Sequence, residues 1–332
     1  MPAASEDDLI DAVRKVLSDE APGVIVPVGD DAAVVEPGRH HVVLSTDMLV
    51  EGVHFTLDTI SAQDLGHKAL TVNVSDLAAM GAAPRYALIA LGLPSVAEGA
   101  WVMELYGGLR EAAGDLGMTI VGGDMSRSEQ HVISVAVVGA VAKGRAVTRS
   151  GARPGDALVV TGTLGAAAAG LALAKSPPQD VRDELTTDAG REVVRAHLRP
   201  AARIGEGETL AHAGASAMID LSDGLAIDLH RVCAESQVGA RIRVADLPIA
   251  AAAREVADAL RLDPVRLALG GGEDYELLAA IPHEVVEPTR HKLAERYGSS
   301  LTEIGEITES GVVIEDDGKE RPLERTGWDH FA

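Results

Sequence analysis

Cysteine is nearly absent from this chain of 332 residues, and long apolar runs are absent altogether. The single cysteine, Cys233, excludes an internal disulfide and fits a reducing compartment. No run of about 18 apolar residues exists, so the sequence predicts no membrane span. The N-terminus is acidic and carries no apolar signal segment. We therefore expect a cytoplasmic protein.

Basic residues are also few. The chain has 29 lysines and arginines against 51 acidic residues, which gives a formal net charge of −22 at pH 7. This sign argues against a surface that binds nucleic acid or an anionic membrane. A polyanionic ligand such as ATP would be repelled as well, except at a site where metal ions and a few placed arginines or lysines reverse the local charge.

Several motifs of covalent and nucleotide chemistry are missing. The sequence has no cluster of His and Cys, no Ser-His-Asp order, and no Gly-x-Gly-x-x-Gly between a predicted strand and helix. The turn GTLG at 162–165 leads into an Ala-rich helix like a phosphate-cradling turn, but it lacks the Lys-Ser/Thr of a P-loop. Cys233 follows Val232 in a predicted helix, which favours a core position over a reactive thiol.

What the chain does contain is acidic residues beside glycines or at the ends of predicted strands. Such clusters occur around residues 30–31, 47, 124, 220–223 and 273–274. Neighbouring ionised carboxylates repel one another unless a cation lies between them. Carboxylate and hydroxyl oxygens without His or Cys point to Mg²⁺ or a similar hard ion.

Each acidic cluster, taken alone, has an ordinary alternative. Glycine and aspartate are the commonest turn residues, so the sequences at 29–31 and 122–124 also suit plain turns. Asp76 could lie on the exposed face of its helix, and Asp228 could only complement a helix dipole. Together the clusters describe a multi-metal site of oxygen ligands. Such a site suits phosphoryl transfer, in which positioning and charge neutralisation supply most of the catalysis.

The length favours two domains, because a single core rarely grows beyond about 300 residues. Composition changes abruptly to basic residues, glycine and proline over 145–156. We place the boundary there, which gives domains over 1–146 and 147–332. Arg149 and the neighbouring arginines could meet phosphates, or they could belong to a solvated linker.

Apolar periodicity predicts alternating helices and strands in both halves. Helices are expected over 5–17, from Ser61 to Gly81 and from Ser95 toward residue 117. The Val-rich run 131–143 predicts a strand that needs cover on both faces, at the sheet centre or at a dimer interface. The other expected strands are 32–35, 41–46, 86–93, 119–124, 157–161, 217–220 and 277–281, with helices over 179–198 and 201–213, and a last helix, two short strands and a tail.

At these same residues the sequence resembles the thiamine-monophosphate kinase family, which belongs to the aminoimidazole ribonucleotide synthetase superfamily. The resemblance covers nearly the whole chain, and the segment 47–55 separates this family from its relatives. The matching motifs, in family order, are GDDAA at 29–33, TDMLVEGVHF at 46–55, NVSDLAAMG at 73–81, GGD at 122–124, SDGL at 222–225 and GEDYEL at 272–277.

This resemblance implies an α/β (α+β) architecture with two domains. The N-terminal sheet domain would dimerise through its sheet, and a C-terminal α/β domain would follow. ATP and several Mg²⁺ ions are the implied co-substrate and cofactor. The implied reaction is direct in-line transfer of the ATP γ-phosphate to thiamine monophosphate, giving the diphosphate. The acceptor is already a phosphate oxygen of low pKa, so no catalytic residue for covalent or general-base chemistry is required.

The resemblance also implies roles for individual residues. Metal ligands fall on Asp30, Ser45, Thr46, Asp47, Asp76, Asp124, Asp220 and Asp223. Contacts to ATP fall on Tyr106, Gly123, Asp124, Arg149 and Ser222. Contacts to thiamine monophosphate fall on His54, Glu273 and Trp328.

Three rival functions remain open at this point. A synthetase-type ATP enzyme of the same superfamily is one, although selenophosphate synthetases carry Cys or selenocysteine near the N-terminus and this chain does not. A Mg²⁺-dependent phosphohydrolase would share the acids but would not need the Arg149 region. A non-catalytic, acidic metal- or nucleotide-binding protein is the third. Formation of ADP that strictly requires an added acceptor would separate the kinase from all three.

Overall fold

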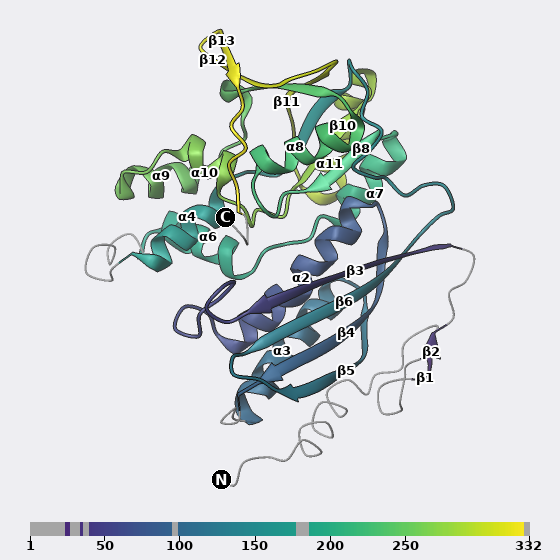
Figure 1. Cartoon of the computed structure of the whole chain (residues 1–332), viewed down its shortest axis with the longest axis vertical. Coiled ribbons are helices and arrows are strands. Elements are labelled where there is room, and N and C mark those ends of the chain that lie inside the picture. Colours follow the sequence, from purple (N-terminus) through teal and green to yellow (C-terminus); the bar gives the residue numbers. More distant parts are fainter. Residues whose placement is uncertain (1–23, 27–33, 36–39, 95–98, 177–185, 329–332) are drawn as a thin grey trace. The chain divides into compact units, whose positions relative to one another are not determined.

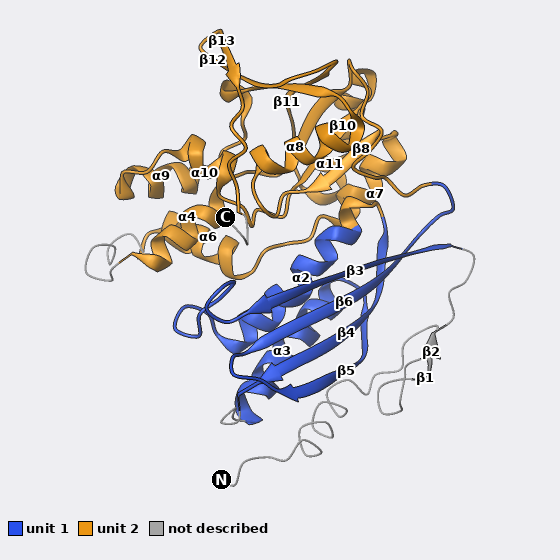
Figure 2. Ribbon diagram, in the orientation of Figure 1, with its two compact units in different colours: residues 1–77, 82–144 blue, residues 78–81, 145–332 orange. Residues whose placement is uncertain are grey.

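The computed structural model describes residues 24–26, 34–35, 40–94, 99–176 and 186–328 (Figure 1). Contacts divide the chain into two compact units, residues 1–77 with 82–144 and residues 78–81 with 145–332 (Figure 2). Both units combine helices with sheets, which confirms the α/β class. The expected helix over 5–17 and the metal candidate Asp30 lie outside the described residues.

The first unit is built on a four-stranded sheet with the order β3-β6-β4-β5. β6 runs antiparallel to both of its neighbours, whereas β4 and β5 are parallel. Helices α2 and α3 lie on one face of this sheet (Figure 1). A separate antiparallel pair is formed by β1 and β2. The bounds are β1 (Val24–Val26), β2 (Val34–Val35), β3 (His41–Val50), α2 (Ala62–Ala79), β4 (Ala83–Leu93), α3 (Gly99–Asp115), β5 (Thr119–Arg127) and β6 (Val132–Val141).

The two faces of this sheet differ in burial. Alternate residues of β6, from Ile133 to Val137, are buried, and the residues between them are half-buried. Because opposed residues share a face, the register from β3 through β6 to β4 gathers four large apolar side chains on the second face. All four are well exposed: Val42 (46%), Leu44 (70%), Met48 (54%) and Leu88 (43%).

Helices α2 and α3 approach each other closely at two glycines. A Cβ added at Gly66 would lie 2.0 Å from the carbonyl oxygen of Leu105. One added at Gly108 would lie 1.8 Å from the carbonyl oxygen of Gln63. Backbones can meet at this distance only because neither glycine has a side chain, so any larger residue would force the helices apart.

The second unit contains a seven-stranded sheet with the order β13-β12-β9-β11-β7-β10-β8. Every neighbouring pair among these described strands is antiparallel except β9 and β12. The strands are β7 (Ala157–Thr161), β8 (Ala217–Asp220), β9 (Gly239–Arg243), β10 (Leu277–Ile281), β11 (Leu301–Thr308), β12 (Val312–Asp316) and β13 (Lys319–Pro322). The helices are α4 (Ala166–Lys175), α6 (Asp188–Leu198), α7 (Ile204–Ala213), α8 (Leu225–Ser236), α9 (Ala251–Leu260), α10 (Pro264–Gly270) and α11 (Val286–Tyr297), with 3₁₀ turns η2 (Val244–Asp246) and η3 (His283–Val285).

Both faces of the central strands in this sheet are covered. Leu158 and Val160 of β7 pack into one core, which includes residues of α4, α6, α8, α9 and α10. Val159 packs into a second core with residues of α7 and α11. Every residue of β7 and β10 is therefore buried, and the two strands appear in the sequence as continuous apolar runs.

Most of the expected elements are confirmed among the described residues. The hydroxyl of Ser61 accepts a hydrogen bond from the Asp64 backbone N–H at 3.0 Å, so Ser61 caps α2 as predicted. Cys233 is 3% exposed in α8, and burial raises the pKa of its thiol to about 11. No helix in the described ranges is long and apolar enough to cross a membrane.

Two expected strand ends are wrong. β3 continues to Val50 and β5 to Arg127, so Asp47 and Asp124 lie within strands and not at their ends. The ladder to β6 continues through Asp47, paired with Val135, and outweighs the low strand preference of aspartate. The sequence also failed to predict β9, α9, α10 and one of the three strands after α11.

The crossing of α2 and α3 provides a matched stability test. We expect Gly108→Ala to destabilise the protein by about 1–3 kcal/mol, because the new methyl group overlaps the Gln63 carbonyl. Gly107→Ala is the control, since nothing lies within 4 Å of a Cβ there. Alanine at that helical position should be neutral or stabilising by up to about 1 kcal/mol. Urea denaturation measures both, and equal stabilities would contradict the close crossing.

Candidate functional site

Three predicted metal ligands meet where β3 faces α2 in the first unit. Ser45 and Asp47 lie two residues apart on one face of β3. The Ser45 hydroxyl donates to Asp76 Oδ2 at 2.5 Å. The backbone N–H of Asp47 donates to Asn73 Oδ1 at 2.7 Å, and Asn73 Nδ2 donates to the carbonyl oxygen of Ala69 at 2.8 Å. Asn73 is fully buried, so it fixes the strand against the helix at the position of Asp47.

Asp124 lies at the other edge of the same sheet. It belongs to β5, and the order β3-β6-β4-β5 places it three strand spacings from β3. This is about 14 Å at a spacing of about 4.8 Å. Thr46 and Asp124 both lie on the sheet face that carries the exposed apolar side chains. The Asp124 carboxylate accepts a hydrogen bond from the Ser126 hydroxyl at 3.3 Å. The single-chain structure therefore does not bring Asp124 to Asp47.

The turn after β3 holds His54, which is predicted to contact thiamine monophosphate. The backbone N–H of Val50 donates to His54 Nδ1 at 3.0 Å, so the neutral imidazole carries its proton on Nε2. Glu51 Oε2 lies 2.8 Å from His131 Nδ1 and accepts the His131 backbone N–H at 3.1 Å. The hydrogen bonds from the ring and backbone of His131 lower the pKa of Glu51. Both contacts hold the turn against β6.

The structure places two further candidates of the first unit in packing roles. Tyr106 is 3% exposed in α3, and burial raises the pKa of its hydroxyl well above the ordinary value. Gly123 lies in β5 where a Cβ would be 1.8 Å from the carbonyl oxygen of Ile89. The close approach expected at this glycine is thus made by a neighbouring backbone. Their contacts with ATP stay predictions.

In the second unit, four predicted site residues meet through backbone hydrogen bonds. The N–H of Glu273 donates to the carbonyl oxygen of Ser222 at 2.7 Å. The N–H of Trp328 donates to the carbonyl oxygen of Asp223 at 3.0 Å. The turn after β8, the loop before β10 and the segment after β13 therefore lie together. The side chain of Trp328 is 48% exposed there.

Asp223 has charged neighbours that the sequence did not reveal. Arg231 Nη1 lies 2.6 Å from Asp223 Oδ2 and 2.6 Å from Asp228 Oδ1. Asp228 is fully buried and accepts the backbone N–H groups of Asp223 and Gly224, each at 3.2 Å. Burial raises the pKa of Asp228 to about 6, against the lowering effect of Arg231. Asp228 therefore does more than complement a helix dipole, because it fixes the turn that carries Asp223.

Glu273, which is predicted to contact thiamine monophosphate, is held in a backbone conformation that L residues rarely adopt. Its φ is +60°, and that of Tyr275 is +49°. Glu273 Oε2 lies 2.9 Å from His197 Nδ1 of α6, and His197 is 7% exposed. No sequence motif marks His197. The partner of Glu273 is thus a buried imidazole from a distant helix.

Two carboxylates beside Glu273 fill the glycine-rich turn at 162–165. The N–H of Gly165 donates to both carboxylate oxygens of Asp274, at 3.0 and 2.9 Å. Glu276 accepts from the Thr161 hydroxyl at 2.7 Å and from Arg203 Nε at 2.7 Å. A Cβ at Gly162 would lie 2.0 Å from Glu276 Oε1. The turn that resembled a phosphate cradle therefore holds carboxyl groups of the protein itself.

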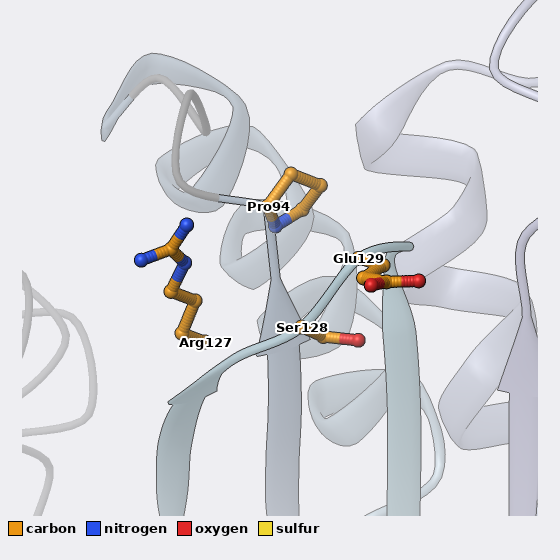
Figure 3. A pocket seen from close by; sticks show the side chains of 4 residues that line it. All are labelled: Pro94, Arg127, Ser128 and Glu129. Carbon is orange, nitrogen blue, oxygen red and sulfur yellow. The ribbon is translucent and has the colours of Figure 1, made fainter.

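The remaining candidates are placed as follows. Asp220 ends β8, is 3% exposed and pairs with Leu277 in the ladder. Arg149 is exposed in the loop between β6 and β7. A hollow of about 470 Å³ in the first unit is lined by other residues, Pro94 and 127–129 (Figure 3). Arg127 and Glu129 give it opposite charges, and none of the predicted site residues lines it.

The donor sets suit a hard cation in their chemistry. The group on β3 and α2 offers one hydroxyl and two carboxylates, and the group at the end of β8 and in the turn that follows offers Asp220, Ser222 and Asp223. All are oxygen donors, which Mg²⁺ prefers. Among the residues whose placement is described, no three His, Cys, Asp or Glu side chains converge on one point.

Comparison with known proteins places this arrangement in a family. Residues 29–141 match the family described as AIR synthase related protein, N-terminal domain. Residues 153–317 match AIR synthase related protein, C-terminal domain. The two matches together span most of the chain.

Similar proteins are found by sequence and by structure. Thiamine-monophosphate kinase of Escherichia coli (strain K12) is 42% identical over 309 residues, covering 92% of this chain and 91% of that protein. The crystal structure of thiamine-monophosphate kinase from Stenotrophomonas maltophilia K279a has a TM-score of 0.81 and 35% identity, covering 94% of this chain and 96% of that one. The structure of AaThiL complexed with AMPPCP and TMP has a TM-score of 0.78 and 37% identity, covering 98% and 97%.

The raised pKa of Asp274 should make the free energy of unfolding depend on pH. Burial raises the pKa of its carboxyl from 3.8 to about 7. Between these values the folded chain keeps a proton that the unfolded chain has released, so Asp274 makes stability fall as pH rises through this window. We expect Asp274→Asn to remove up to about 1.4 kcal/mol per pH unit from that slope. Urea denaturation at pH 5, 6 and 7 measures it, and identical slopes in both proteins would show that Asp274 does not titrate there.

Proposed function

This chain belongs to the AIR synthase related family and within it to the thiamine-monophosphate kinases, and we propose that its two groups of oxygen ligands serve that reaction together with Mg²⁺. It phosphorylates thiamine monophosphate with ATP and is therefore a kinase whose acceptor is a phosphate group. The observation that carries the proposal is the meeting of Ser222, Asp223, Glu273 and Trp328 at three backbone segments.

Positioning and charge do most of the work in this proposal. The attacking atom is an oxygen of the thiamine monophosphate phosphate, which is ionised at neutral pH and needs no strong base. The ATP γ-phosphate passes directly to this oxygen, and ADP leaves in line. No covalent intermediate is required. This agrees with a chain whose one cysteine is buried with a raised thiol pKa.

Mg²⁺ is held, in this proposal, by carboxylate and hydroxyl oxygens. When bound, Mg²⁺ neutralises phosphate charge and orients the reacting groups. The Ser45 hydroxyl and the Asn73 amide fix Asp76 and Asp47, so these donors are placed before any ligand arrives. The proposed ligands are Asp30, Ser45, Thr46, Asp47, Asp76, Asp124, Asp220 and Asp223.

In this proposal ATP and thiamine monophosphate are bound by different residues. We assign the ATP contacts to Tyr106, Gly123, Asp124, Arg149 and Ser222. We assign the acceptor contacts to His54, Glu273 and Trp328. The half-exposed indole of Trp328 offers an aromatic face to a flat ring or cation, worth on the order of 1 kcal/mol or more when desolvated. Glu273 supplies a carboxylate beside the same turn, which suits the positive thiazolium of thiamine.

A homodimer is part of the proposal, because the second face of the four-stranded sheet exposes the apolar side chains described above. The Val-rich strand β6 lies between β3 and β4 in this sheet, so one of its faces is part of the same surface. Thr46 and Asp124 share the same face, so a second copy packed there can bring Asp124 of one chain toward Thr46 of the other.

Three further properties are proposed with it. The domains extend over 1–146 and 147–332. The location is the cytoplasm, supported by the single buried cysteine. Nucleic acid and membranes are not partners, which the net charge of −22 supports.

The reaction is tested by measuring ADP with and without acceptor. ADP should form only when ATP, Mg²⁺ and thiamine monophosphate are all present. Asp47→Asn should abolish turnover, because the amide keeps the shape but loses the charge that holds the ion, and its backbone bond to Asn73 remains. Asp258→Asn removes the same charge from the exposed face of α9 and should retain turnover. ADP formed without acceptor would indicate a hydrolase, and near-parental rates in Asp47→Asn with unchanged melting would remove Asp47 from the site.

The dimer is tested by placing a charge on the exposed sheet face. Leu44→Glu should give a monomer, because a carboxylate at a side chain now 70% exposed would be buried between two copies. Leu262→Glu, at a 39% exposed leucine of the second unit, is the control and should stay dimeric. Light scattering at micromolar concentration measures the mass. A monomeric parent protein, or a dimeric Leu44→Glu, would refute this interface.

A further inference from the structure

Ser236, the last residue of α8, makes three hydrogen bonds to the loop that carries Arg149. Its hydroxyl donates to the carbonyl oxygen of Arg149 at 2.9 Å. The same oxygen accepts the backbone N–H groups of Gly151 and Ala152, each at 3.1 Å. One side chain thus uses its donor and both acceptor positions on a single loop. Ser236 is separated from Arg149 by 87 residues in sequence, and no motif marks it.

The loop is also held on its other sides. The N–H of Met218 in β8 donates to the carbonyl oxygen of Thr148 at 3.0 Å, and the Thr148 hydroxyl donates to the carbonyl oxygen of Ser150 at 2.7 Å. Gly151 has a φ of +121°, and a Cβ there would lie 2.6 Å from the Ser216 carbonyl oxygen. This position therefore requires glycine. The backbone on both sides of Arg149 is fixed, while the Arg149 side chain itself is exposed.

We propose that Ser236 is the positioning residue for Arg149. Its hydroxyl fixes the backbone from which the guanidinium is directed toward the phosphates of ATP. The inference rests on the proposed function, because it takes the contact between Arg149 and ATP from there. A guanidinium meets phosphate oxygens through a planar fork of N–H groups, so its value depends on direction as well as charge. Small displacements of such a group cost much of its effect. Ser236 supplies direction through the backbone and touches no ligand.

The proposal predicts a loss confined to the nucleotide. Without the Ser236 hydroxyl, the carbonyl of Arg149 and two N–H groups lose their partner, and the loop gains freedom. The loss of such bonds corresponds to about 3- to 10-fold weaker ATP binding. Thiamine monophosphate binding should be unchanged, because Ser236 bonds none of the residues assigned to the acceptor.

The experiment compares Ser236→Ala, Ser236→Thr, Arg149→Ala and the double variant in the full-length protein. The KM for ATP, the KM for thiamine monophosphate and kcat are measured, and a non-hydrolysable ATP analogue is titrated by calorimetry in the presence of Mg²⁺. Ser300→Ala is the matched control, since the Ser300 hydroxyl also donates to one backbone carbonyl, that of Gly162, at 3.1 Å. Melting temperatures show whether each variant is folded.

We expect Ser236→Ala to weaken analogue binding, Ser236→Thr to restore much of it, and Ser300→Ala to leave it unchanged. In the Arg149→Ala background, removal of the Ser236 hydroxyl should add little, because the group it aims is gone. Additive losses, or equal losses for ATP and acceptor, would overturn the proposal. If Arg149→Ala weakens ATP and Ser236→Ala does not, Ser236 is not the positioning residue and the proposed function stands. If Arg149→Ala has no effect, the assignment of Arg149 fails, and the inference fails with it.

Discussion

The two carboxylates on either side of Tyr275 need partners, and this need fixes the course of the second unit around its site. Asp274 accepts a hydrogen bond from the N–H of Gly165 at the start of α4. Glu276 accepts hydrogen bonds from the Thr161 hydroxyl and from Arg203 at the start of α7. A buried carboxylate without such partners would cost several kcal/mol, so these segments must meet there. Glu273 and Tyr275, the two neighbours of Asp274, both have a left-handed backbone conformation, and the N–H of Glu273 bonds to the carbonyl oxygen of Ser222.

The first unit follows the same rule with smaller groups. Asn73 is fully buried in α2 and donates and accepts on both sides, so it positions β3 at Asp47 without adding charge. The Ser45 hydroxyl of β3 likewise donates to the Asp76 carboxylate of α2 without adding charge. In a chain with a net charge of −22, these neutral partners leave carboxylate charge for a cation.

Three arginines illustrate two different roles. Arg203 and Arg231 neutralise carboxylates of the protein itself, at Glu276 and at the pair Asp223 and Asp228. Arg149 is exposed on a loop whose backbone is tied down by Ser236. A chain with so few cations therefore uses some to neutralise its own carboxylates, and it presents another from a fixed backbone, as the proposed contact with phosphate would require.

Local pattern was enough to predict the α/β class, the start of α2 at Ser61 and the strand β6, because each depends on residues a few positions apart. The family motifs supplied the candidate site residues, whose roles stay predictions. Only the tertiary structure showed that Asp47 and Asp124 lie inside strands at opposite sheet edges, since the partner strand decides where a ladder continues. It alone revealed Arg231, His197 and Ser236, for each is defined by contact and carries no local signal. Charge and periodicity can be predicted along a chain, whereas the partner that a buried group acquires depends on which distant segments pack together.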